Sequence, residues 1–169
     1  MVDILVRPEN PSDVAGIYAL TELAFRDMEH SAGDEQDLIN SLRERGALAL
    51  SLVAIKDNAI VGHVAFSPAT HETGVNGWFA LGPVSVDPAL QKQGIGSLLI
   101  KRGLVQLQEM NAKGCILVGH LEYYPRFGFR VMPHLAPERE PGEYFMVLPF
   151  GDTPLQGRFA FHPAFYGEP

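Results

Sequence analysis

Residues 81–99 constrain the fold of this chain more than any other stretch. They read L-G-P-V-S-V-D-P-A-L-Q-K-Q-G-I-G-S-L-L, and an apolar-periodic segment follows the two glycines. This order predicts a strand, a short polar loop and a helix. The start of a helix presents free backbone N–H groups to an anion, and glycine lets a phosphate approach the main chain because it has no Cβ. We therefore expect a phosphate-type anion site at Gly94 and Gly96.

Length and composition favour one globular domain. The chain has 169 residues, of which 46% are hydrophobic and 20% charged. Its net charge of −7 disfavours a nucleic-acid surface and favours a cationic partner. A single cysteine excludes an internal disulfide, and no apolar run reaches the roughly 20 residues that span a bilayer. The N-terminus lacks the pattern of a signal peptide. We expect a cytoplasmic protein with no membrane or nucleic-acid partner.

Hydrophobic periodicity predicts helices and strands on both sides of the glycine loop. The expected strands cover residues 2–7, 47–56, 59–67, 78–86, 115–119 and 143–148, and the expected helices cover residues 10–25, 34–46 and 97–111. Asp57 and Asn58 are typical of a two-residue hairpin turn between the second and third strands. Residues 120–129 have room for only a turn or two of helix. The pattern predicts one α/β domain with a mixed sheet.

Two common phosphate-binding motifs do not fit the loop. A dinucleotide-binding G-x-G-x-x-G would need a third glycine where Leu99 stands, and the chain contains no G-K-[ST] of a Walker P-loop. The loop reads Q-x-x-G-x-G from Gln91 to Gly96, directly after a V-x-V strand end.

That pattern resembles the acyl-CoA-binding motif of the GNAT superfamily of N-acetyltransferases. Residues 124–129, Y-P-R-F-G-F, are similar to the family's Y-x-x-[LF]-G-F element after its fifth strand, and the order of elements over residues 2–148 also matches. The wording G-H-x-E-Y-Y-P-R-F-G-F and the tail H-P-A-F resemble a bacterial subgroup whose substrates are largely unassigned. The resemblance implies an α/β (α+β) domain over residues 1–150, with a mixed, mostly antiparallel sheet of about six to seven strands and about four helices. Residues 151–169 are expected to pack on the same domain.

The resemblance also implies an activity. Acetyl-coenzyme A (acetyl-CoA) would donate its acetyl group directly to a primary amine of a small molecule or peptide, without a metal. Backbone N–H groups of the loop would hold the diphosphate, and the preceding strand would pair with the pantetheine arm like an added strand. The implied cofactor-binding residues are Val84, Ser85, Val86, Gln91, Lys92, Gln93, Gly94, Ile95, Gly96, Ser97 and Tyr124.

Tyr124 is the candidate general acid, because it matches the tyrosine of the family element and a phenol of pKa about 10 stays protonated at neutral pH. Tyr123 is expected to be a core aromatic. His120 and Glu122 are the candidates for the general base, and the family also relays the proton through water. Leu117 stands where the family often has an asparagine.

Several alternatives stay open. Glu22 and Asp87 are weaker candidates for the base, whereas His63 and Cys115 fit a packed interior better than catalysis. The acceptor would be selected by the first two helices, residues 68–77 and the tail. A homodimer through the tail or an edge strand is compatible with the sequence. The alternative functions are a non-catalytic acyl-CoA-binding sensor or regulatory module and a nucleotide-binding α/β protein.

Overall fold

The computed structural model describes residues 3–29, 31–154 and 156–169. The strands are β1 (Leu5–Pro8), β2 (Leu50–Lys56), β3 (Ala59–His71), β4 (Trp78–Val86), β5 (Gly114–Val118), β6 (Arg130–Val131), β7 (Phe145–Pro149) and β8 (Phe159–Ala160). The α-helices are α1 (Val14–Phe25), α2 (Glu35–Glu44) and α3 (Ile95–Glu109). Short 3-10 turns complete the chain, among them η3 (Tyr124–Phe127) and η6 (Pro163–Tyr166).

The strands form one sheet in the order β1-β2-β3-β4-β5-β7-β6, with β8 pairing the far end of β3. Every pairing is antiparallel except β4 with β5, so the mixed, mostly antiparallel sheet is confirmed. The counts differ from the expectation, since the described residues hold eight strands and three α-helices. β6 and β8 have only two residues each, too short for a periodicity signal, and the expected fourth helix is the single turn η3.

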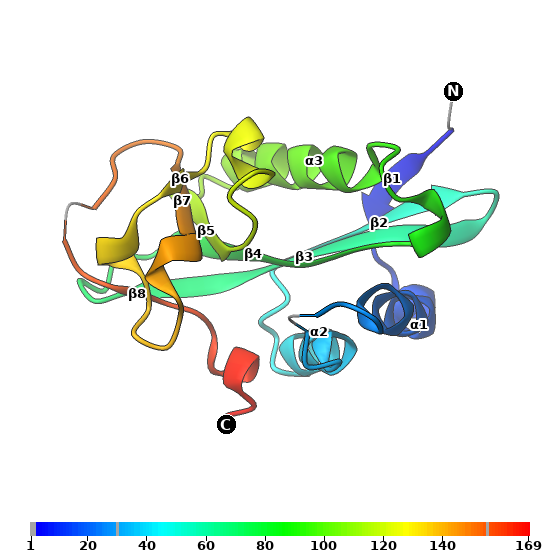
Figure 1. The fold of residues 1–169 in the computed structure, drawn as a ribbon, viewed down its shortest axis with the longest axis horizontal. Coiled ribbons are helices and arrows are strands. Elements are labelled where there is room, and N and C mark those ends of the chain that lie inside the picture. The colour runs from blue at the N-terminus through cyan, green and yellow to red at the C-terminus, as the bar shows by residue number, and fades with distance from the viewer. Residues whose placement is uncertain (1–2, 30, 155) are drawn as a thin grey trace.

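The helices lie in two layers (Figure 1). α3 covers one face of the sheet, whereas α1 and α2 cover the other. The buried face of α3 packs on β2, β3 and β4 through Leu99, Ile100, Leu104 and Leu107. Met110, the first residue after the helix, is exposed.

Local sequence explains the β2–β3 hairpin. Asp57 and Asn58 adopt φ values of 50° and 64°, which two-residue hairpin turns require, so the predicted turn is confirmed. β3 does not end at residue 67 as expected but continues to His71, because its last residues pair with β4 and β8. The connection to β4 is correspondingly shorter.

The C-terminal segment packs against the sheet. Thr70 pairs with Ala160 of β8, and the buried ring of Phe159 lies 4.8 Å from that of Trp78. The turn η6 contacts α2. The first strand begins at Leu5 rather than at residue 2, which lies outside the described residues. No helix within the described ranges is long and apolar enough to cross a membrane.

Candidate functional site

The sheet opens between β4 and β5. The two strands pair only from Trp78 with Gly114 to Ala80 with Ile116. Beyond that point β5 pairs with β7 and β4 pairs with β3, so the β5-facing edge of β4 from Leu81 onward has no partner strand among the described residues. Such an edge exposes N–H and C=O groups that can bond an extended ligand.

A bulge marks the place where the opening begins. Val64 faces Val84, but Phe66 faces Leu81, so β4 carries one more residue than β3 over this interval. Gly82 lies in the bulge with a φ of 136°, a conformation that side chains disfavour. The bulge follows directly after Ala80, the last residue of β4 that pairs with β5.

Val84 and Val86 pack against the core beneath α3, while Ser85 points to the opposite face. Ser85 is buried, with its Oγ 3.5 Å from Thr21 Oγ1 of α1. The side chains at the end of β4 therefore pack within the protein. The main-chain groups on its β5-facing edge remain available to a ligand.

The glycine loop ends at the start of α3. Gly94 is the N-cap residue with a φ of 85°, and the first helical hydrogen bond runs from Leu98 N to Gly94 O at 3.0 Å. The amides of Ile95, Gly96 and Ser97 precede that bond and have no helical carbonyl to donate to. Free amides and the helix dipole together favour an anion here. Gln91, Lys92 and Gln93 form the exposed part of the loop.

Tyr124 lies beside the end of β5. A Cβ atom added to Gly119 would come within 2.5 Å of the Tyr124 ring, so the ring can occupy this position because residue 119 is a glycine. Phe129 packs edge-on to it, at 6.1 Å between centroids. Burial, with smaller contributions from Tyr123 and Cys115, raises the pKa of Tyr124 to about 12. Its hydroxyl makes no hydrogen bond within the described residues and is not among their buried unpaired atoms, so it reaches solvent.

The four candidate bases are not equally placed. His120 and Glu122 are exposed on the turn after β5, where His120 O accepts bonds from the amides of Tyr123 and Tyr124. Glu22 is exposed and pairs with Arg26 at 3.6 Å. Asp87 Oδ1 caps the turn after β4 by accepting from Ala89 N at 2.9 Å. Only His120 and Glu122 lie on the turn that carries Tyr124.

Tyr123 is the functional candidate that sequence reasoning missed. Its hydroxyl is 3.2 Å from Ser97 Oγ, in the first turn of α3. A Cβ atom on Gly96 would lie 3.6 Å from both that hydroxyl and Val86 Cγ2. The doubled tyrosine was the available signal, but no periodicity reveals which of two adjacent rings faces the loop.

His63 belongs to a buried polar network. Its ring is fully buried, and its Nε2 lies 2.7 Å from Ser51 Oγ, which in turn bonds Glu9. Glu9 is held by Arg43 through two contacts of 2.9 Å. Burial above all lowers the pKa of His63 to about 4, so the ring is neutral. The expectation of an interior residue is confirmed, as it is for buried Cys115, whose pKa burial raises.

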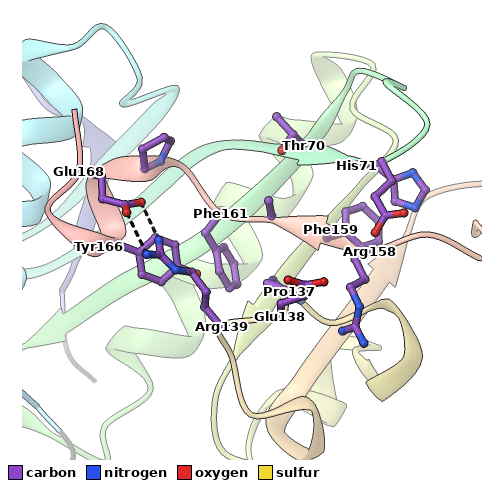
Figure 2. Close-up of a pocket in the computed structure, with 13 residues that line it drawn as sticks. Thr70, His71, Pro137, Glu138, Arg139, Arg158, Phe159, Phe161, Tyr166 and Glu168 are labelled. Atoms are coloured by element: carbon purple, nitrogen blue, oxygen red, sulfur yellow. Dashed lines mark hydrogen bonds and ion pairs between the residues drawn. The ribbon is translucent and has the colours of Figure 1, made fainter.

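A cavity of about 440 Å³ lies at the other end of β3 from Gly62, the partner of Val86. Figure 2 shows its lining from β8, η6 and the loop before β7, with Arg139 paired to Glu168 at 2.6 Å. Three glutamates and two arginines line it, and this mixture selects neither an anion nor a cation. The cavity is thus separate from the glycine loop. No group of three metal-ligating side chains occurs in the described part of the chain.

Comparisons with known proteins agree with this geometry. Residues 48–131 match the model of the acetyltransferase (GNAT) domain. "Uncharacterized N-acetyltransferase YhbS" of Escherichia coli K12 is 35% identical over 158 residues, which cover 91% of this chain and 92% of that protein.

Two solved structures superpose on nearly the whole chain. One is a GNAT family acetyltransferase from Brucella melitensis in complex with acetyl-CoA, with 44% identity, a TM-score of 0.87, and coverage of 98% of this chain and 99% of that one. The other is YhbS from Escherichia coli in complex with CoA, with 31% identity, a TM-score of 0.87, and coverage of 98% and 93%. The chain therefore belongs to the GNAT family of N-acetyltransferases.

Proposed function

We propose that the chain transfers the acetyl group of acetyl-CoA directly to a primary amine of a small molecule or peptide. The observation that carries the proposal is the unpaired edge of β4, which leads from the bulge at Gly82 to the free amides at the start of α3. An extended arm that ends in a diphosphate fits this combination, and the related structures carry acetyl-CoA and CoA.

Different main-chain groups of the protein bind different parts of acetyl-CoA. The amides of Ile95, Gly96 and Ser97 hold the diphosphate, each charge-assisted bond contributing about 1.5–3 kcal/mol. The main chain of Val84–Val86 pairs with the amides of the pantetheine arm. When bound, acetyl-CoA supplies the acetyl group as a thioester. A main-chain N–H of β4 polarises the thioester carbonyl, which requires a donor fixed before reaction.

Tyr124 holds the proton for the leaving sulfur. Because burial raises its pKa to about 12, the phenol stays protonated throughout the physiological range. His120 or Glu122, on the same turn, removes the proton from the attacking amine directly or through water. The net charge of −7 favours a cationic acceptor, and the family subgroup and acidic chain are compatible with a cytoplasmic enzyme.

The acceptor approaches from the face of α1 and α2. α3 lies on the opposite face of the sheet (Figure 1), so an amine that meets the thioester from the other side comes from the side of α1 and α2. Selectivity for the acceptor then belongs to α1, α2 and the residues after β7.

Two assays test the function. Calorimetry with acetyl-CoA, CoA, ATP and NAD should show binding of the first two only, and absence of CoA binding at micromolar concentration would refute the proposal. A screen of diverse amines should show release of free thiol from acetyl-CoA with at least one acceptor class. Tight CoA binding with no release across the library would support a sensor instead.

A further inference from the structure

Tyr123 joins two parts of the site that come from different elements. Its hydroxyl is 3.2 Å from Ser97 Oγ in the first turn of α3, while its backbone belongs to the turn after β5. A Cβ added to Gly96 would lie 3.6 Å from this hydroxyl and 3.6 Å from Val86 Cγ2. The end of β4, the start of α3 and the turn after β5 therefore meet around Gly96.

The Tyr123 ring is held on several sides. The guanidinium of Arg126 lies 4.4 Å from the ring centroid, and Arg126 Nε donates to Tyr123 O at 2.8 Å. The rings of Tyr124 and Phe127 pack against it edge-on, at 5.1 and 5.4 Å between centroids. Because the Tyr124 ring packs against the Tyr123 ring, a displacement of the Tyr123 ring would also displace that of Tyr124.

We propose that Tyr123 is a positioning residue that couples occupation of the diphosphate site to the placement of Tyr124. The inference rests on the proposed function, in which the amides beside Ser97 hold the diphosphate and Tyr124 serves the leaving sulfur. A diphosphate bound there fixes the first turn of α3 and Ser97 with it. Ser97 then fixes the Tyr123 hydroxyl, and the packed pair of rings places the Tyr124 phenol. Coupling of this kind acts in both directions.

The kinetic test is a double-mutant cycle with two donors. Tyr123→Phe keeps the ring and the Arg126 stack but removes the hydroxyl, and Ser97→Ala removes its partner. With acetyl-CoA, each substitution should lower kcat about three- to tenfold, the loss of one hydrogen bond, and the double variant should be no slower than either single one. With acetyl-pantetheine, which lacks the diphosphate, Tyr123→Phe should leave kcat unchanged.

Tyr144→Phe is the matched control, because this tyrosine is exposed and the substitution leaves its main chain, which accepts a bond from Gly119 N, unchanged. It should leave kcat unchanged with both donors, and all variants should keep the wild-type unfolding temperature within a few degrees. Multiplying effects in the double variant, or an equal loss with both donors, would overturn the coupling.

A second experiment follows the environment of Tyr124 by fluorine NMR and does not depend on acetyl transfer. Fluorotyrosine incorporated into the protein gives a fluorine resonance for Tyr124, assigned by its loss in Tyr124→Phe. Saturating CoA should shift this resonance in the wild type, whereas pantetheine should not, and Ser97→Ala should lose at least half of the shift. An equal shift in wild type and Ser97→Ala refutes the coupling. Coupling without acetyl transfer would instead refute only the proposed function.

Discussion

At the scale of single residues, Tyr124 carries the sharpest chemical claim. Substitution Tyr124→Phe should lower kcat by about 10²-fold, the usual contribution of a positioned acid, while the Kd for acetyl-CoA stays within about twofold. The ring and its contacts with Gly119 and Phe129 are retained, so the loss isolates the hydroxyl. Steady-state kinetics and calorimetry on the same preparation check both parts.

The pH profile gives an independent check on Tyr124. A phenol with a pKa of about 12 remains protonated to well above neutrality. Below about pH 10, therefore, ionisation of Tyr124 should cause no fall in wild-type kcat. An alkaline limb near pH 8 that disappears in the variant would contradict the raised pKa.

His63 predicts how stability responds to acid. Its pKa is about 4 in the folded protein against 6.5 when exposed, so the unfolded chain takes up a proton over a range where the folded ring does not. The free energy of unfolding should therefore fall as the pH drops from 6.5 to 4, by roughly 3 kcal/mol from this residue. Urea unfolding at several pH values measures the decline.

The variant His63→Gln separates this effect from other groups, because glutamine does not titrate. Its stability at neutral pH can differ, but its decline between pH 6.5 and 4 should be clearly shallower. Glu9 and Asp13 contribute at the acid end of this range and below it. Burial raises the pKa of Glu9 but Arg43 and Ser51 outweigh it, and Arg7 stabilises charged Asp13, so both pKa values are lowered. An equal decline in His63→Gln would exclude His63 as the source.

The sequence predicts the position of residues that belong to a local motif. Gly94 lies directly before α3 and Tyr124 in the turn after β5, as expected, while their roles stay predictions. Tyr123 could not be assigned, because the choice between two adjacent rings is made by Ser97 on another element. The Glu9–Ser51–His63 network joins three separate segments in the same way.

At the scale of elements, the diphosphate site can be tested by comparing Gly94, which precedes α3, with Gly33, which precedes α2. Gly94 and Gly33 both have positive φ values, 85° and 79°, and an added Cβ would meet no atom within 4 Å at either. Alanine should therefore cost about 1 kcal/mol of stability at each position. Only Gly94→Ala should weaken CoA binding, by about tenfold, because a Cβ there obstructs the approach of the phosphate. Calorimetry that shows equal affinities for both variants would place the diphosphate elsewhere.

The packing of α3 makes a second elemental prediction. A Cβ on Gly103 would lie 2.3 Å from the buried ring of Phe66, whereas one on Gly16 of α1 meets only the flexible end of Ile60 at 2.9 Å. Gly103→Ala should destabilise by about 1–3 kcal/mol despite its helix propensity. Gly16→Ala should be neutral or stabilise by up to about 1 kcal/mol. The urea midpoints of the two variants measure these changes in stability. An equal change in both variants would contradict the close contact of α3 with the sheet.

Elements with strong periodicity were predictable, among them β4 and α3. The continuation of β3 to His71 and the strand β8 were not predictable. The end of β3 pairs with β4 and then with β8, which is distant in the chain. Pairing between distant segments leaves no periodic signal in a single sequence.

At the scale of the whole molecule, the topology explains why one domain can hold a long cofactor. The single parallel pair, β4 with β5, is also the pair that separates, and the start of α3 and the turn with Tyr123 and Tyr124 flank the opening. The direct transfer that we propose agrees with the state of the one cysteine, which is buried in β5 and whose pKa burial raises. A covalent acetyl-enzyme has no suitable thiol there.

Mass spectrometry that follows the acetyl group distinguishes direct transfer from a route through an acetyl-enzyme. The protein is incubated with acetyl-CoA, with and without the acceptor found in the amine screen, and the protein, the amine and CoA are weighed in the same sample. Direct transfer predicts no acetyl group on the protein with acetyl-CoA alone. When the acceptor is present, the amount of acetylated amine should equal the amount of CoA released. An acetylated protein that passes its group to the amine, or CoA release without acetylated amine, would contradict direct transfer.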